Sequence, residues 1–124
     1  MSRVSFRDLD GGEPIEGMSA LEKWYKSIRD VPIDGLELDD VCVAVRQKLF
    51  LQFVLPVALR YLQNDPLSGE LYDGELAKAV AGLPSRYWPS EPGLKDEAKR
   101  ILRLQDYSSY ELAQPTVEAF LHAT

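Results

Sequence analysis

The stretch that decides the fold spans residues 39–64 and reads DDVCVAVRQKLFLQFVLPVALRYLQN. Its apolar side chains would surround nearly the whole circumference of a helix, and neighbouring elements cover such a helix on most sides. Pro56 cannot donate a backbone hydrogen bond, and its ring clashes with the carbonyl group of Gln52. We therefore expect a central apolar helix that kinks, or breaks into two, at residues 52–55.

Amphipathic segments on both sides of this stretch predict further helices. Ser19 precedes Glu22 by three residues, which is the spacing of a capping box at a helix start. The segments expected to be helical are 18–30, 39–64, 72–81 (starting at Tyr72 or capped by Asp73), 94–105 and 115–122. Residues 1–17 are expected to be loop, with room for a short strand at 4–6. The sequence thus predicts a mainly α fold, a compact bundle of about five helices forming one domain over residues 1–124.

The formal net charge of −6 comes from the middle of the chain. Between residues 30 and 75 there are nine acidic and three basic residues, whereas the remainder carries eleven of each. This excess argues against nucleic-acid binding, which needs cations to displace phosphate counterions. It favours rapid encounter with a basic protein, although a charge of this size also serves simply to keep a small protein soluble.

The compartment follows from cysteine usage and hydropathy. Cys42 is the only cysteine and lies in an apolar run, so it is expected to be a buried thiol in a reducing compartment. No run of 18 apolar residues is present, and the first ten residues lack the apolar centre of a signal peptide. We expect a cytoplasmic protein without a membrane partner.

The residues that usually carry chemistry are scarce. The single histidine, His122, lies close to the end of the sequence, so neither a catalytic triad nor a zinc site is expected, and no phosphate-binding glycine loop is present. Glu70, Asp73 and Glu75 could form a carboxylate enzyme or hold a cation. The structural alternative is that Asp73 caps a helix and Glu75 stabilises its first turn, with Glu70 and Glu75 free to face a partner. We expect no catalytic residue, metal or cofactor.

Two other features favour protein binding. Arg46 lies within the apolar stretch and must reach water or pair with a carboxylate, for which an acid at residues 70–75 is the expected partner. Tyr107 and Tyr110 lie in a predicted loop, where a tyrosine either anchors an interface or covers the core of a small domain.

Residues 36–83, about 40% of the chain, resemble the helical immunity proteins of contact-dependent growth inhibition (CDI) systems. The resemblance rests on an Arg-Gln pair, a proline in the helix and the block DPLSGELYDGEL at residues 65–76. The matching positions are 38–42, 46–47, 49–50, 54–56, 62 and 65–76. Its structural motif residues are Arg46, Gln47, Pro56, Pro66, Gly69 and Gly74.

The resemblance implies a cytoplasmic protein that binds the C-terminal domain of its cognate toxin, commonly a basic nuclease, and blocks its active site or substrate surface. It implies no enzymatic activity, no direct nucleic-acid contact, and a monomer or weak dimer. The expected toxin-binding residues are Glu37, Asp39, Asp40, Glu70, Asp73, Glu75, Tyr107 and Tyr110.

Two alternatives make different structural predictions. An acidic adaptor or chaperone-type module without a toxin partner would expose a large apolar groove along its central helix. A carboxylate enzyme would bring at least two of Glu70, Asp73 and Glu75 together in a concave pocket.

Overall fold

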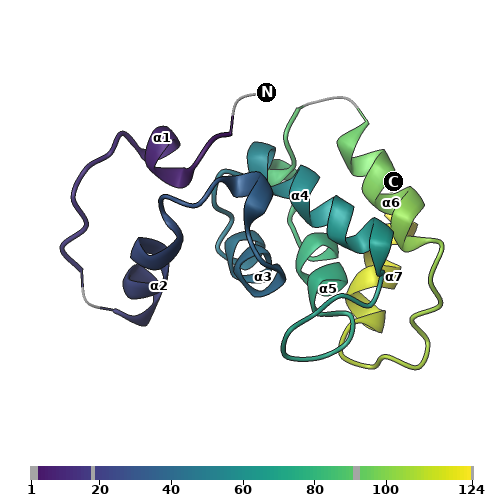
Figure 1. Cartoon of the computed structure of the whole chain (residues 1–124). Coiled ribbons are helices and arrows are strands. Elements are labelled where there is room, and N and C mark those ends of the chain that lie inside the picture. The colour runs from purple at the N-terminus through teal and green to yellow at the C-terminus, as the bar shows by residue number, and fades with distance from the viewer. Residues whose placement is uncertain (1–2, 18, 91–92, 124) are drawn as a thin grey trace.

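The computed structural model describes residues 3–17, 19–90 and 93–123, and in these ranges the fold is mainly α (Figure 1). This confirms the predicted fold class, with more helices than the expected five. The α-helices are α1 (Phe6–Asp10), α2 (Ala20–Ile28), α3 (Leu38–Arg46), α4 (Leu51–Asn64), α5 (Glu75–Ala81), α6 (Leu94–Leu102) and α7 (Gln114–His122). Two 3₁₀ turns are η1 (Ile33–Gly35) and η2 (Ser85–Tyr87). None of these helices has the combination of length and apolarity needed to cross a membrane.

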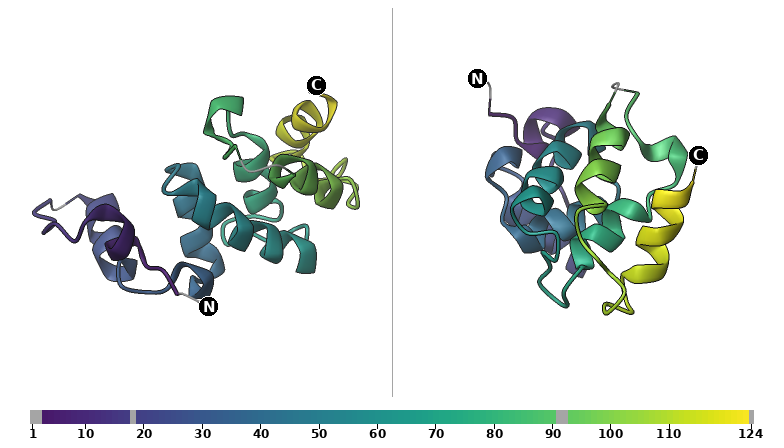
Figure 2. Two further views of the ribbon diagram at one scale, coloured as in Figure 1. Left: turned by 90° about the horizontal axis from the view of Figure 1, so that it is seen from above. Right: turned by 90° about the vertical axis from the view of Figure 1, so that its right-hand side faces the viewer.

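The central helix α4 organises the packing. It lies against α3, α5 and α6, and α7 closes the bundle by packing on α5 and α6. The side chains of Val54, Leu55 and Leu62 on α4 are fully buried in the core that these helices share. Seen from above, α1 and α2 lie at one end of the molecule and α6 and α7 at the other (Figure 2).

The first helix, α1, lies in a segment that we expected to be loop. Ser5 caps it, with Asp8 closing a capping box of the same spacing as the one predicted at Ser19. The expected strand at residues 4–6 is reduced to an isolated β-bridge between Ser5 and Pro32, because Phe6 already begins the helix. Phe6 is fully buried, with its ring 5.5 Å from that of Tyr25, so α1 is held by the core.

Helix α2 begins as predicted, with Ser19 as its N-cap and Glu22 completing the capping box. Met18, which the prediction included, lies outside the described residues. The helix is tied to α1 by a mostly buried ion pair, in which the Arg29 guanidinium donates to both carboxylate oxygens of Asp10 at 2.7 and 2.8 Å. The Tyr25 hydroxyl also donates to Asp10, at 2.7 Å. These charge-assisted bonds lower the pKa of Asp10 well below its usual range.

The central stretch divides earlier than predicted. α3 ends at Arg46 and α4 begins at Leu51, whereas Pro56 lies inside α4 without ending it. The N–H groups of Leu49 and Lys48 donate to the carbonyl groups of Ala44 and Val45, so α3 ends in a Schellman motif with Lys48 in the left-handed region (φ +58°). The alternative that the stretch breaks at 52–55 is therefore wrong, and the alternative of a kink there stays a prediction.

The remaining helices follow the predicted order with shifted ends. α5 starts at Glu75 with Gly74 as its N-cap (φ +89°), so the expectation that Asp73 caps this helix is wrong. α7 carries Pro115 in its first turn, a position that proline favours. Trp88, in the segment between η2 and α6, stacks on Phe120 with 5.6 Å between ring centroids and so packs against the core.

Candidate functional site

The loop between α4 and α5, residues 65–74, is fixed by a buried carboxylate at the start of α5. The Glu75 side chain is only 3% exposed, and its Oε1 accepts the backbone N–H groups of Glu70 (2.7 Å) and Leu71 (2.9 Å). Its Oε2 accepts Nη1 of Arg46 at 2.7 Å. The predicted pairing of Arg46 with an acid of this segment is thereby confirmed. The expectation that Glu75 faces a partner is wrong, because this side chain is buried and both of its oxygens accept hydrogen bonds inside the fold.

The charge state of Glu75 follows from the same contacts. Burial raises the pKa of this carboxyl, but the N–H groups of Leu71 and Glu70 and the Arg46 guanidinium lower it by more. The net pKa is below the ordinary value. Glu75 is therefore an anion at neutral pH, and its carboxylate holds the loop through these hydrogen bonds.

Backbone hydrogen bonds also fix the conformation of this first loop. The N–H groups of Gly74 and Leu76 donate to the carbonyl groups of Leu67 (2.9 Å) and Ser68 (3.1 Å). A Cβ at Gly69 would lie 2.1 Å from the carbonyl oxygen of Tyr72, so no side chain fits there without movement of the backbone. The conformation of residues 65–74 is thus determined by the fold, although its outer side chains are in solvent.

A second loop, residues 103–113 between α6 and α7, packs against the first. Tyr107 is 4% exposed, and its hydroxyl donates to the carbonyl group of Pro66 at 2.8 Å. Burial raises the pKa of this hydroxyl, so it stays protonated and donates at neutral pH. Tyr107 therefore links the two loops, and of the two alternatives its burial favours a side chain that covers the core over an exposed anchor. Tyr110 is half-buried.

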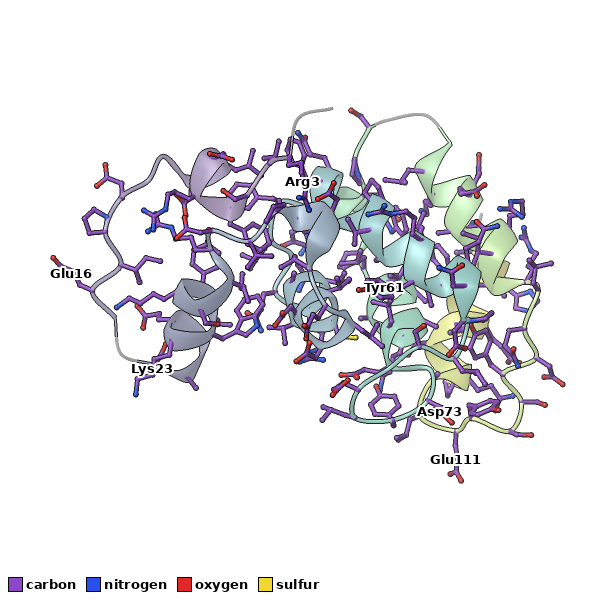
Figure 3. The ribbon with its side chains drawn as sticks, in the orientation of Figure 1. Arg3, Glu16, Lys23, Tyr61, Asp73 and Glu111 are labelled. Atoms are coloured by element: carbon purple, nitrogen blue, oxygen red, sulfur yellow. The ribbon has the colours of Figure 1, made fainter. Side chains whose placement is uncertain are left out.

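The two loops form one end of the molecule, where Asp73 and Glu111 lie at the same edge (Figure 3). Residues 65–74 and 103–113 together contain five acidic residues and one basic residue, Arg103, which directly follows α6. Two large apolar side chains are exposed among them, Leu71 at 76% and Leu112 at 57%. We define the loop end by its exposed residues Glu70, Leu71, Asp73, Glu111 and Leu112.

The other predicted acidic residues lie at the start of α3. Glu37 is the exposed N-cap residue of this helix, and Asp39 is exposed in its first turn. Asp40 is partly buried, and its Oδ1 accepts the indole N–H of Trp24 at 2.9 Å. Carboxylates here are stabilised by the helix dipole, and Asp40 also joins α3 to α2. The predicted acidic residues therefore form two groups, one at the start of α3 and one in the first loop.

The three carboxylates of the enzyme alternative differ in their exposure to solvent. Glu70 and Asp73 are exposed, whereas Glu75 is buried in its hydrogen bonds. Among the residues that the structure describes, no group of three or more His, Cys, Asp and Glu side chains is arranged to hold a metal ion.

Glu75 instead lines a groove of about 500 Å³ whose charged residues are mostly cationic. Arg46, Lys48 and Lys78 border it, together with Tyr72. We call this the cationic groove, and it contrasts with the acidic loop end beside it. Sequence reasoning did not find it, because Lys78 is far from Arg46 and Lys48 along the chain.

Comparison with known proteins identifies the family. A family model described as CDI immunity proteins matches residues 7–98, about three quarters of the chain. The chain belongs to the CDI immunity proteins. No curated protein sequence matches it. Membership implies that this immunity protein binds and neutralises a CDI toxin, and the matched region includes the first loop but ends before the second.

Proposed function

We propose that this immunity protein acts in the cytoplasm by binding the C-terminal domain of its cognate toxin, a nuclease with a basic surface. By occupying the active site or the substrate surface of the toxin, it prevents the nuclease from reaching nucleic acid. The chain does this as one domain, a monomer or weak dimer, without cofactor, metal or catalysis of its own. The single observation that carries the proposal is the family match over residues 7–98.

The electrostatics of the chain support this mode of action. A nuclease presents positive potential to its substrate, and an acidic protein with a net charge of −6 is attracted to the same surface. The exposed carboxylates of Glu37, Asp39, Glu70 and Asp73 supply contacts for basic side chains, and the half-buried Tyr110 adds an aromatic one. Asp40 contributes to the negative potential while it holds Trp24.

Purified components test the proposal. The toxin domain encoded beside this chain should bind it with a Kd below about 100 nM in calorimetry, as is usual for specific complexes. Stoichiometric addition of the immunity protein should abolish nuclease activity, and its expression should protect cells that receive the toxin. A toxin domain that neither binds nor is inhibited would refute the proposal, as would turnover of a substrate by the immunity protein alone.

The adaptor alternative is not supported by the surface of the fold. It requires the apolar residues of the central helix to line an open groove, but Val54, Leu55, Val57 and Leu62 are buried in the core. The most exposed large apolar residues instead lie in loops, at Leu71, Leu104 and Leu112.

A further inference from the structure

We propose that the loop end is the surface with which this chain docks on its toxin, and that Leu71 is the central anchor of the contact. The partner surface that it fits is an apolar recess bordered by Lys or Arg side chains. This inference rests on the proposed function and adds to it the location and the chemistry of the contact.

Leu71 combines an exposed side chain with a backbone that the fold holds in place. Single apolar residues on a surface are common and need no explanation. Leu71, however, is the most exposed of the large apolar side chains in the described part of the chain, and its own N–H is held by the buried Glu75 carboxylate at 2.9 Å. The buried Glu75 carboxylate thus fixes the backbone of Leu71, although the Leu71 side chain itself is mostly in solvent.

A fixed loop is an advantage in binding. Association normally costs conformational entropy for each loop and side chain that becomes ordered, and pre-organisation removes much of this cost. Residues 65–74 are already ordered by Glu75, by the close packing of Gly69 and by the Tyr107 hydroxyl bond to Pro66. Leu71 can therefore enter a recess with little ordering of its backbone.

The surroundings of Leu71 have the composition of an interface. Glu70 and Asp73 lie on either side of it in the loop, and Glu111 and Leu112 come from the adjoining loop. An apolar centre with a charged rim is the usual anatomy of a specific protein contact. Since the two loops carry five acidic residues against one cation, Arg103, the rim that complements them is basic.

Replacement of the anchor tests the inference with a matched control. Leu71→Asp should weaken binding to the cognate toxin domain by roughly 30-fold or more, the threshold of an interface hot spot. Leu104→Asp makes the same change at a side chain of the second loop that is 72% exposed but is not one of the five residues that define the loop end, and it should alter Kd by less than about 3-fold. Circular dichroism and thermal unfolding should show both variants folded, because neither side chain is in the core.

A charge-matched pair tests the acidic rim. Glu70→Lys with Asp73→Lys changes the net charge by the same amount as Glu13→Lys with Glu16→Lys, and Glu16 lies at the opposite end of the molecule (Figure 3). The first pair should lower the association rate about 10-fold more than the second at low salt.

The outcomes separate the two proposals. A wild-type chain that fails to bind the toxin domain refutes the proposed function. If the wild-type chain binds and a folded Leu71→Asp variant binds equally well, the function stands and the loop end is not the docking surface. Loss of binding in Lys48→Glu with Lys78→Glu, without loss in Leu71→Asp, would assign the contact to the cationic groove instead.

Discussion

At the residue scale, Glu75 shows why a charged side chain is kept in the interior. A buried carboxylate is costly unless it is both paired and hydrogen-bonded. Glu75 meets both conditions, with two backbone N–H groups on one oxygen and Arg46 on the other. The two kinds of partner differ in strength, because the Arg46 side chain is 42% exposed and its pairing is partly screened by water.

Separate substitutions distinguish these contributions. Glu75→Ala should lower the free energy of unfolding by about 2–3 kcal/mol, since two partly buried N–H groups and Arg46 lose their acceptor. Arg46→Met should cost only about 0.5–1 kcal/mol, because the exposed cation contributes little once screened. Urea titration monitored by tryptophan fluorescence provides both values. Equal losses would show that the ion pair, not the N–H groups, holds the loop, and an unchanged Arg46→Met variant would remove any role for the pair.

The pKa of Glu75 also predicts a dependence on pH. Because the folded-state pKa is lower than the ordinary value, Glu75 contributes stability that is fully present above the ordinary value, about 4.3. This contribution is lost as the pH falls through the lowered value. The unfolding free energy of the Glu75→Gln variant should therefore change less than that of the wild type between about pH 5 and pH 2. Parallel pH profiles of the two proteins would contradict the assignment.

At the element scale, the division between α3 and α4 lies at two residues with left-handed backbone dihedral angles, and Pro56 lies further along, inside α4. Lys48 takes the left-handed position after α3, which glycine usually occupies, and Phe50 is also left-handed at φ +41°. Pro56 falls on an exposed position of α4, where the helix tolerates the loss of one hydrogen bond.

This geometry predicts that glycine stabilises the turn. A non-glycine residue in the left-handed region costs roughly 1 kcal/mol, and glycine removes that steric cost while adding some entropy to the unfolded chain. Lys48→Gly should therefore raise the unfolding free energy by up to about 1 kcal/mol. Lys48→Ala, which keeps the Cβ atom, is the matched control and should not stabilise. If both variants behave alike, the lysine side chain and not the backbone conformation determines the effect.

Local sequence signals predicted the elements better than their ends or their exposure. The Ser19–Glu22 capping box and the pairing of Arg46 could be predicted, because each depends on a recognisable spacing or on an unavoidable charge. The break at Lys48 could not, since lysine carries no signal for a left-handed residue. The burial of Tyr107 could not be decided from the sequence either, because it depends on Pro66, which is 41 residues away along the chain.

At the scale of the whole molecule, the charge is divided between surfaces. The loop end is acidic, whereas Arg46, Lys48 and Lys78 make the adjacent groove cationic. A partner that meets the loop end therefore has to avoid the groove or complement it with acidic residues. Such a division orients an approaching molecule as well as attracting it.

Salt should therefore act mainly on the association with the toxin. Between about 0.05 and 0.5 M NaCl the Debye length shrinks from about 14 to 4 Å, so long-range attraction is largely screened. We expect the association rate constant to fall by at least about 10-fold over this range, while the dissociation rate constant changes little. Stopped-flow fluorescence and surface plasmon resonance measure the two rates. An association rate that is independent of salt would contradict electrostatic steering by the acidic residues.

Cys42 has a practical consequence for observing the complex. It is the only cysteine of the sequence and it is buried, and burial raises its pKa to about 12, so the folded chain presents almost no reactive thiolate at neutral pH. A maleimide dye should leave the native protein unlabelled. The variant Ser109→Cys, at an exposed position of the second loop, would then carry a single fluorophore beside the loop end. Occupancy of that surface would be visible as a change in emission, without any alteration of the core.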